Sequence, residues 1–132
     1  MPAALVDLLF ACFTLAFSVY HEVRVDNVPA TSQMLEGRNL GLTATDNDGV
    51  PHVYLVDWAT LPASDTRAGL SSPDITFVHE MLHVADRADN GMYDGSLEPG
   101  GCRTIPRDCA HSWVYWALAN PGAARNILDR SH

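Results

Sequence analysis

A chain of 132 residues has the length of one domain with one hydrophobic core, and its 47% hydrophobic content is typical of soluble globular proteins. Its 16 acidic residues outnumber its 8 basic residues, for a formal net charge of −8. This balance argues against a nucleic-acid-binding surface, which requires a basic patch. We therefore predict a single domain over residues 1–132 and expect a monomer with no nucleic-acid partner.

Residues 3–20 form an apolar stretch. Its centre, residues 8–17, is similar to the core of a signal peptide, but no basic residue precedes it, Asp7 interrupts it and no A-x-A cleavage site follows. The stretch is too short for a transmembrane helix, so we expect no membrane partner. We predict a buried helix, with a signal sequence as the alternative. The apolar face of this helix would contain Leu5, Leu8, Leu9, Cys12, Phe13, Ala16, Phe17 and Tyr20.

A β-hairpin is predicted in the middle of the chain. Residues 21–38 are mixed in character, and Pro29 breaks any pattern there. Residues 40–45 alternate like a strand, residues 46–49 are a turn cluster, and residues 52–58 read as a second strand.

A long helix is predicted to begin at Ser72-Pro73-Asp74, which supplies a capping hydroxyl, a proline at the first position and an acid in the first turn. It should end near residues 89–91. A glycine-rich loop over residues 92–107, a closing helix over residues 109–120 and a short tail helix should follow. Together these elements predict a compact α+β fold with an N-terminal helix, a small sheet, a central helix and C-terminal helices.

The central helix carries an H-E-x-x-H motif formed by His79, Glu80 and His83. Two histidines four residues apart lie on one face of a helix and can offer both imidazoles to one metal ion. A glutamate directly after the first histidine lies close to a metal-bound water, whose pKa zinc lowers toward neutrality. The motif therefore predicts one zinc ion, with Glu80 as the general base.

The residues around the motif favour this interpretation. Glu80 is the only charged residue between Asp74 and Asp86, and a glutamate in an apolar helix is costly to bury without a partner. A metal and its water would supply that partner. The alternative is an ordinary amphipathic helix with two surface histidines and an exposed glutamate.

A catalytic zinc needs a third protein ligand and an open position for water. A rigid helix would hold Asp86 about one turn beyond the metal. Asp89 lies where the helix should end, Asp94 in the next loop, and His111 at the start of the closing helix. The spacing alone leaves the last three open as candidates.

This order of residues resembles the deuterolysin-like aspzincins, which are small, mostly fungal, secreted zinc endopeptidases that include lysine-specific metalloendopeptidases. Their second signature, G-T-x-x-D-x-x-Y-G, is similar to residues 89–95, where Tyr93 and the glycine two residues later match Y-G and Asp89 precedes the tyrosine. Their later N-A-D-[SN]-[YH] segment is similar to residues 109–117. The likeness covers roughly residues 40–121.

The resemblance implies a zincin-like domain of a secreted zinc metalloendopeptidase that cleaves peptide or protein substrates. Asp89 would be the third zinc ligand, with Asp94 and His111 as alternatives, and Tyr93 would bind the oxyanion. The G-T pair is absent and Asn90 holds the strict aspartate position of the signature. His111 replaces the aspartate linked to lysine preference, so lysine specificity is not implied.

Three further expectations complete this interpretation. The strand around residues 54–57 could pair with an extended substrate. Cys102 and Cys109 could close a short disulfide in an oxidising compartment, while Cys12 should be buried as a small hydrophobe. The alternative function is a catalytically inactive, secreted zinc-binding protein or antigen on the same scaffold.

Overall fold

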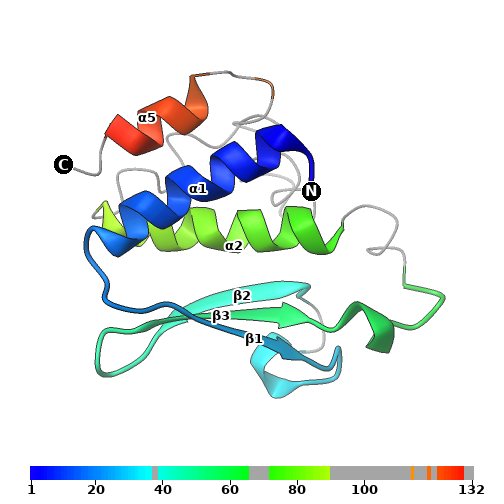
Figure 1. Cartoon of the computed structure of the whole chain (residues 1–132). Coiled ribbons are helices and arrows are strands. Elements are labelled where there is room, and N and C mark those ends of the chain that lie inside the picture. Colours follow the sequence, from blue (N-terminus) through cyan, green and yellow to red (C-terminus); the bar gives the residue numbers. More distant parts are fainter. Residues whose placement is uncertain (37–38, 66–71, 90–113, 115–118, 120–121, 130–132) are drawn as a thin grey trace, which may run out of the picture.

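The computed structural model describes residues 1–36, 39–65, 72–89, 114, 119 and 122–129. In this part of the chain the fold is α+β, as predicted: helices α1 (Ala3–Phe17), α2 (Pro73–Ala88) and α5 (Ala123–Asp129) accompany one three-stranded sheet. Figure 1 shows the layers: α2 lies between α1 and the sheet, and α5 lies on the other side of α1. None of the described helices is long and apolar enough to cross a membrane.

The sheet has the strand order β1-β3-β2. Strand β1 (Arg24–Val28) is parallel to β3 (Pro51–Val56), and β2 (Gly41–Thr45) is antiparallel to β3. The predicted hairpin is therefore confirmed. Strand β1 lies in the segment for which the sequence pattern predicted no element. Nearly all of its residues are exposed, so the strand lacks the alternation of buried and exposed residues that marks a strand in a sequence.

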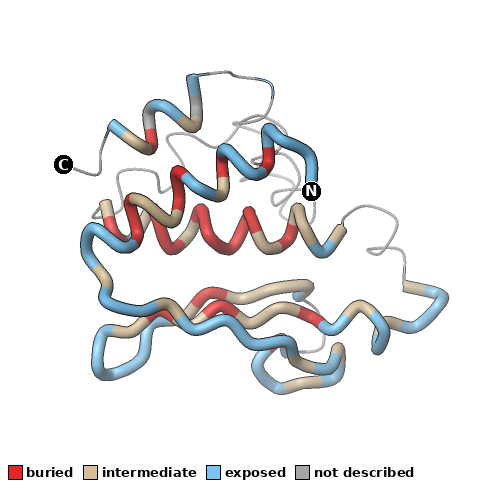
Figure 2. The backbone as a smooth tube through the Cα atoms, in the orientation of Figure 1, coloured by how far each residue is buried: buried red, intermediate tan, exposed pale blue. Residues whose placement is uncertain are grey.

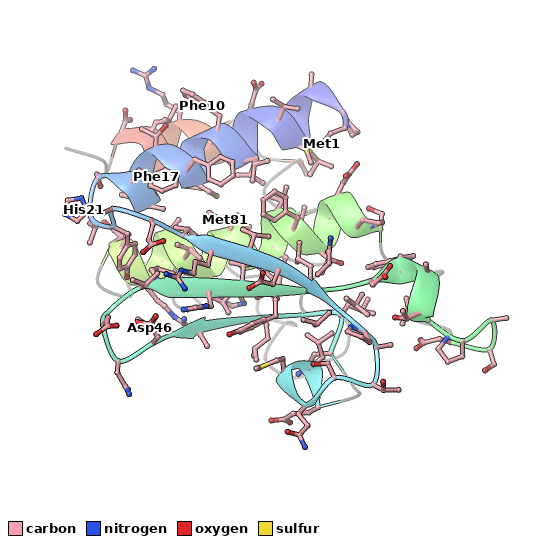
Figure 3. The ribbon with its side chains drawn as sticks, turned by 60° about the horizontal axis from the view of Figure 1, so that its bottom comes forward. Met1, Phe10, Phe17, His21, Asp46 and Met81 are labelled. Atoms are coloured by element: carbon pink, nitrogen blue, oxygen red, sulfur yellow. The ribbon has the colours of Figure 1, made fainter. Side chains whose placement is uncertain are left out.

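The turn of the hairpin follows directly from its residues. One carboxylate oxygen of Asp46 accepts hydrogen bonds from the backbone N–H groups of Asp48 and Val50, at 2.8 and 3.0 Å. Gly49 adopts a φ of 82°, in the left-handed region that favours glycine. Figure 3 shows Asp46 at this end of the sheet. Two short 3₁₀ turns, η1 (Gln33–Leu35) and η2 (Trp58–Thr60), flank the hairpin strands.

Helix α2 begins where the sequence predicts. The Ser72 hydroxyl accepts a hydrogen bond from the backbone N–H of Ile75 at 3.2 Å, and Pro73 occupies the first turn. The helix ends at Ala88, with Asp89 as its C-cap residue. Because α2 contacts both α1 and the sheet, nearly all of its turns contain buried residues (Figure 2).

Helix α1 is a packed helix of the domain, as predicted. Its buried residues are Leu5, Leu8, Ala11, Cys12, Leu15 and Ala16. The assignment of Phe17 to the buried face was wrong, because its side chain is 52% exposed. The Phe17 ring stacks on Phe13, with 6.0 Å between centroids, and it is Phe13 that reaches Phe77 of α2.

Candidate active site

The candidate site lies where the edge strand β2 passes α2. Alternate residues of a strand point to the same face, and in β2 the residues Gly41, Thr43 and Thr45 all contact side chains of α2. A pocket of about 260 Å³ opens between these elements. It is lined by Asn39, Gly41, Leu42, Thr43, His79, Glu80, His83 and Arg87.

His79 and His83 lie side by side in this pocket, as their spacing predicts. Their Nε2 atoms are 3.0 Å apart and their rings meet edge to face at 89°. Two nitrogen ligands at tetrahedral positions around zinc lie about 3.3 Å apart, given Zn–N bonds of about 2.0–2.1 Å. The observed 3.0 Å is close to this spacing and is also the length of a hydrogen bond between the two rings, so the pair has the separation needed to offer two ligands to one zinc ion.

The protonation state of His83 suits a metal ligand. Burial lowers the pKa of His83 to about 4, and the positive charge of Arg87 acts in the same direction. At neutral pH the imidazole is then uncharged, and only the uncharged ring has a nitrogen lone pair to give to a metal.

Glu80 is a buried carboxyl group, with only 6% of its surface exposed. The surface position that the sequence-based alternative gave to Glu80 and to His79 is therefore wrong, since His79 is also only 8% exposed. Burial raises the pKa of Glu80 to about 7, although the hydrogen bond from Thr43 and the charge of Arg87 oppose this shift. A carboxyl group with this pKa can both take up and release a proton near neutral pH.

Strand β2 holds the Glu80 side chain in place. The Thr43 hydroxyl donates a hydrogen bond to Glu80 Oε2 at 2.6 Å and lies 3.2 Å from the Glu80 carbonyl oxygen. A Cβ atom at Gly41 would lie 2.9 Å from Glu80 Cγ, which real Cβ atoms essentially never do, and 3.1 Å from Oε1, which is tighter than most real Cβ contacts. Glycine at position 41 thus permits the strand to approach the helix closely enough for Thr43 to reach the carboxyl group.

Arg87 completes the described part of the site. It lies four residues after His83 on the same face of α2, and its guanidinium donates hydrogen bonds to the Thr43 carbonyl oxygen at 3.0 Å and to Thr45 Oγ1 at 3.3 Å. Sequence reasoning missed Gly41, Thr43 and Arg87. The strand alternation was visible, but no local signal tells which helix a strand will face.

The third zinc ligand is the part of the prediction that the described structure leaves open. Asp89 caps the end of α2 and does not line the pocket. Within the described part of the chain, no three His, Cys, Asp or Glu side chains are grouped so that they could hold a metal ion. The other candidate ligands, Asp94 and His111, and the proposed oxyanion ligand Tyr93 lie outside the described residues, as do Cys102 and Cys109.

Two smaller expectations are decided by the structure. The prediction that residues 54–57 pair with a substrate is wrong for Tyr54 to Val56, because β3 is the central strand and is already paired with β1 and β2. Cys12 is fully buried in the core, as expected, and burial raises the pKa of its thiol.

Comparison of the chain with protein-family models, with curated proteins and with solved structures finds no match. The functional assignment therefore depends on the chemistry of the site itself.

Proposed function

We propose that this protein is a zinc-dependent metalloendopeptidase with a zincin-like domain of the deuterolysin-like aspzincin type. The observation that carries the proposal is the pairing of two histidine Nε2 atoms, 3.0 Å apart, in the same pocket as a buried glutamate with a pKa of about 7. This is the set of groups needed to hold a metal and to move a proton beside it.

His79 and His83 supply two ligands of one zinc ion in this proposal. The third ligand would be Asp89, Asp94 or His111; of these, Asp89 does not line the pocket in the described structure. When bound, zinc supplies Lewis-acid chemistry: it lowers the pKa of a water molecule and polarises the carbonyl group of the scissile peptide bond. Tyr93 would donate a hydrogen bond to the oxyanion.

Glu80 performs the proton transfers. Thr43 occupies Oε2, which leaves Oε1 to accept the proton of the attacking water. The protonated carboxyl group then donates this proton to the leaving amine. The hydrogen bond from Thr43 keeps the carboxyl group oriented between the two steps.

The substrate would bind along β2. This strand lines the pocket, and among the described strands it pairs only with β3, so its outer edge can offer backbone hydrogen bonds to an extended peptide beside the Thr43 carbonyl oxygen, which accepts one from Arg87. A peptide in this position would lie beside the pocket that the two histidines and Glu80 line.

The deciding experiment measures metal content and hydrolysis of an unfolded protein by the wild type and by Glu80→Gln. We expect one zinc per chain in both proteins and a loss of activity of about 10²–10⁴-fold in the variant, because only the proton carrier is removed. His79→Ala and His83→Ala should lose the zinc as well, and Glu22→Gln, on the exposed surface, is the matched control.

Two outcomes would contradict the proposal. Full activity of Glu80→Gln would exclude Glu80 as the base. Stoichiometric zinc in a wild type that cleaves no unfolded protein would favour the inactive zinc-binding protein instead.

A further inference from the structure

Arg87 is a cation held rigidly at the pocket. Its two hydrogen bonds to Thr43 and Thr45 tie the guanidinium to the backbone and side chain of β2. These bonds use two of the five N–H donors of an arginine, so the contacts within the described part of the chain leave three donors for another partner. Because Arg87 is four residues from His83, it lies about 6 Å further along the helix axis, roughly the span of two residues of an extended substrate.

The charge of Arg87 is unusual for its surroundings. It is the one cation among the described residues that line the pocket, in a protein with a net charge of −8. The residue is exposed, and the ion pairs found in the described part of the chain involve other residues. Its side chain lines the same pocket as Glu80 and His83.

We infer that Arg87 binds a carboxylate of the substrate, so that the enzyme selects acidic peptides. A guanidinium with spare, pre-oriented donors matches a carboxylate in charge and geometry. The net negative charge of the protein disfavours acidic ligands elsewhere on its surface, so a preference for them requires a local cation. The carboxylate can come from an Asp or Glu side chain near the scissile bond or from the free C-terminus of the peptide. This inference rests on the proposed peptidase function for its substrate class.

The purely structural role of Arg87 makes a different prediction. If the arginine only fastened β2 to α2, its loss would lower the cleavage of every peptide by the same factor. If it binds a carboxylate, its loss lowers the cleavage of acidic peptides alone. The ratio of kcat/KM for matched Glu and Gln peptides therefore separates the two roles.

The test uses the zinc-loaded full chain and a library of ten-residue peptides with acetylated N-termini and amidated C-termini. The peptides come in matched pairs that differ only in having Glu or Gln at one position, and each position is tested in turn. We expect the wild type to prefer Glu at one position by about tenfold or more, in line with the usual strength of a charge-assisted hydrogen bond. Arg87→Gln should abolish this preference, Arg87→Lys should retain part of it, and Arg87→Glu should reverse it toward Gln. Arg24→Gln, an exposed arginine on β1, should leave it unchanged.

The same library with free C-termini identifies the source of the carboxylate. Cleavage confined to the last residues, and lost on amidation, would assign Arg87 to the terminal carboxylate, whereas a preference retained in amidated peptides would assign it to a side chain. An unchanged Glu/Gln ratio in Arg87→Gln, in both libraries, would overturn the inference.

A binding measurement keeps this test independent of hydrolysis. Fluorescence anisotropy with a labelled Glu peptide and its Gln counterpart is measured on Glu80→Gln, with and without Arg87→Gln. We expect tighter binding of the Glu peptide only when Arg87 is present, weakening as salt is added. Equal binding by the two variants overturns the inference, even if the wild type hydrolyses peptides. An absence of hydrolysis together with Arg87-dependent binding overturns the peptidase function alone.

Discussion

Glu80 carries a carboxyl group that the fold keeps almost entirely from water, next to two histidines and against the backbone of β2. Its neighbour in the site, His83, is shifted in the opposite direction: burial raises the pKa of the acid to about 7 and lowers the pKa of the base to about 4. Both groups are therefore driven toward their uncharged forms. In the metal-free protein this makes stability depend on pH in two opposing ways.

The sign of each contribution follows from proton linkage. The pKa of Glu80 is raised from its ordinary value of 4.5 to about 7, so the folded state binds the proton more tightly than the unfolded state. The stability therefore falls as pH rises from about 4.5 to 7. The pKa of His83 is lowered from its ordinary value of 6.5 to about 4, so the unfolded state binds the proton more tightly than the folded state. The stability therefore falls as pH drops from about 6.5 to 4. Between pH 4.5 and 6.5 the two slopes oppose each other.

Glu80→Gln should therefore stabilise the metal-free protein at neutral pH. The gain is expected to reach about 3 kcal/mol at pH 8, from a pKa shift of about 2.5 units, and to vanish below pH 4.5. Only the pH dependence of stability that comes from His83 would then remain, so the variant should lose stability when the pH is lowered from 6.5. Urea unfolding at several pH values in a chelator measures this, with Glu22→Gln as control. A variant that is less stable than the wild type at pH 8 would contradict the raised pKa.

At the scale of elements, the site depends on the close approach of β2 to α2. Two features of β2 bring the elements together: the missing side chain at Gly41 and the hydroxyl of Thr43. Arg87 reaches back from α2 and bonds the same strand. The strand thus positions the carboxyl group of Glu80 and also forms one wall of the pocket.

If the protein is the proposed peptidase, Gly41→Ala should damage the activity more than the stability. The added methyl group would meet Glu80 and, at 3.1 Å, Thr76 Cγ2, so the carboxyl group must move or the strand must retreat. We expect a stability loss of about 1–3 kcal/mol, as for other overpacked sites, and a fall in kcat well beyond the fraction unfolded. Thermal unfolding and initial rates measure the two effects.

Gly122→Ala is the matched control, because a Cβ atom there has no atom within 4 Å. Its stability should change by less than about 0.5 kcal/mol. Wild-type activity in Gly41→Ala would show that the close contact between β2 and Glu80 is not needed for catalysis.

At the scale of the whole molecule, α2 is the central layer, with α1 on one side and the sheet on the other (Figure 1). The core between α1 and α2 includes Leu15 and Met81, both almost fully buried. Figure 3 shows Met81 on α2 and, on α1, the residues Phe10 and Phe17, which remain exposed. The N-terminal helix is therefore part of the support of the site.

Leu15→Ala should cost about 2–5 kcal/mol, because it opens a cavity in this core. Phe10→Ala removes a larger side chain from the same helix, but one that is 63% exposed, and should change stability by less than about 0.5 kcal/mol. Urea unfolding distinguishes them, and the zinc affinity of Leu15→Ala should fall as α2 loses its support. Equal effects of the two substitutions would mean that α1 does not pack as described.

Features that depend on neighbours in the chain could be read from the sequence alone. Helical periodicity puts His79 and His83 on one face whatever the rest of the fold does, and the cap at Ser72 and the turn at Asp46 are made by residues two to four positions away. The same local rules predicted the hairpin and the N-terminal helix.

Only the tertiary structure decided what faces Glu80 and His83. The contacts of Thr43 with Glu80 and of Arg87 with β2 join residues 37 and 44 positions apart, and no periodicity encodes such pairings. The burial that shifts the pKa values of Glu80 and His83 likewise depends on packing around α2, and so does the exposure of Phe17. The sequence by itself determined the chemical groups of the site and their order on one helix. The fold determined which of them are buried, how they are charged and which strand lies against them, because these depend on long-range packing.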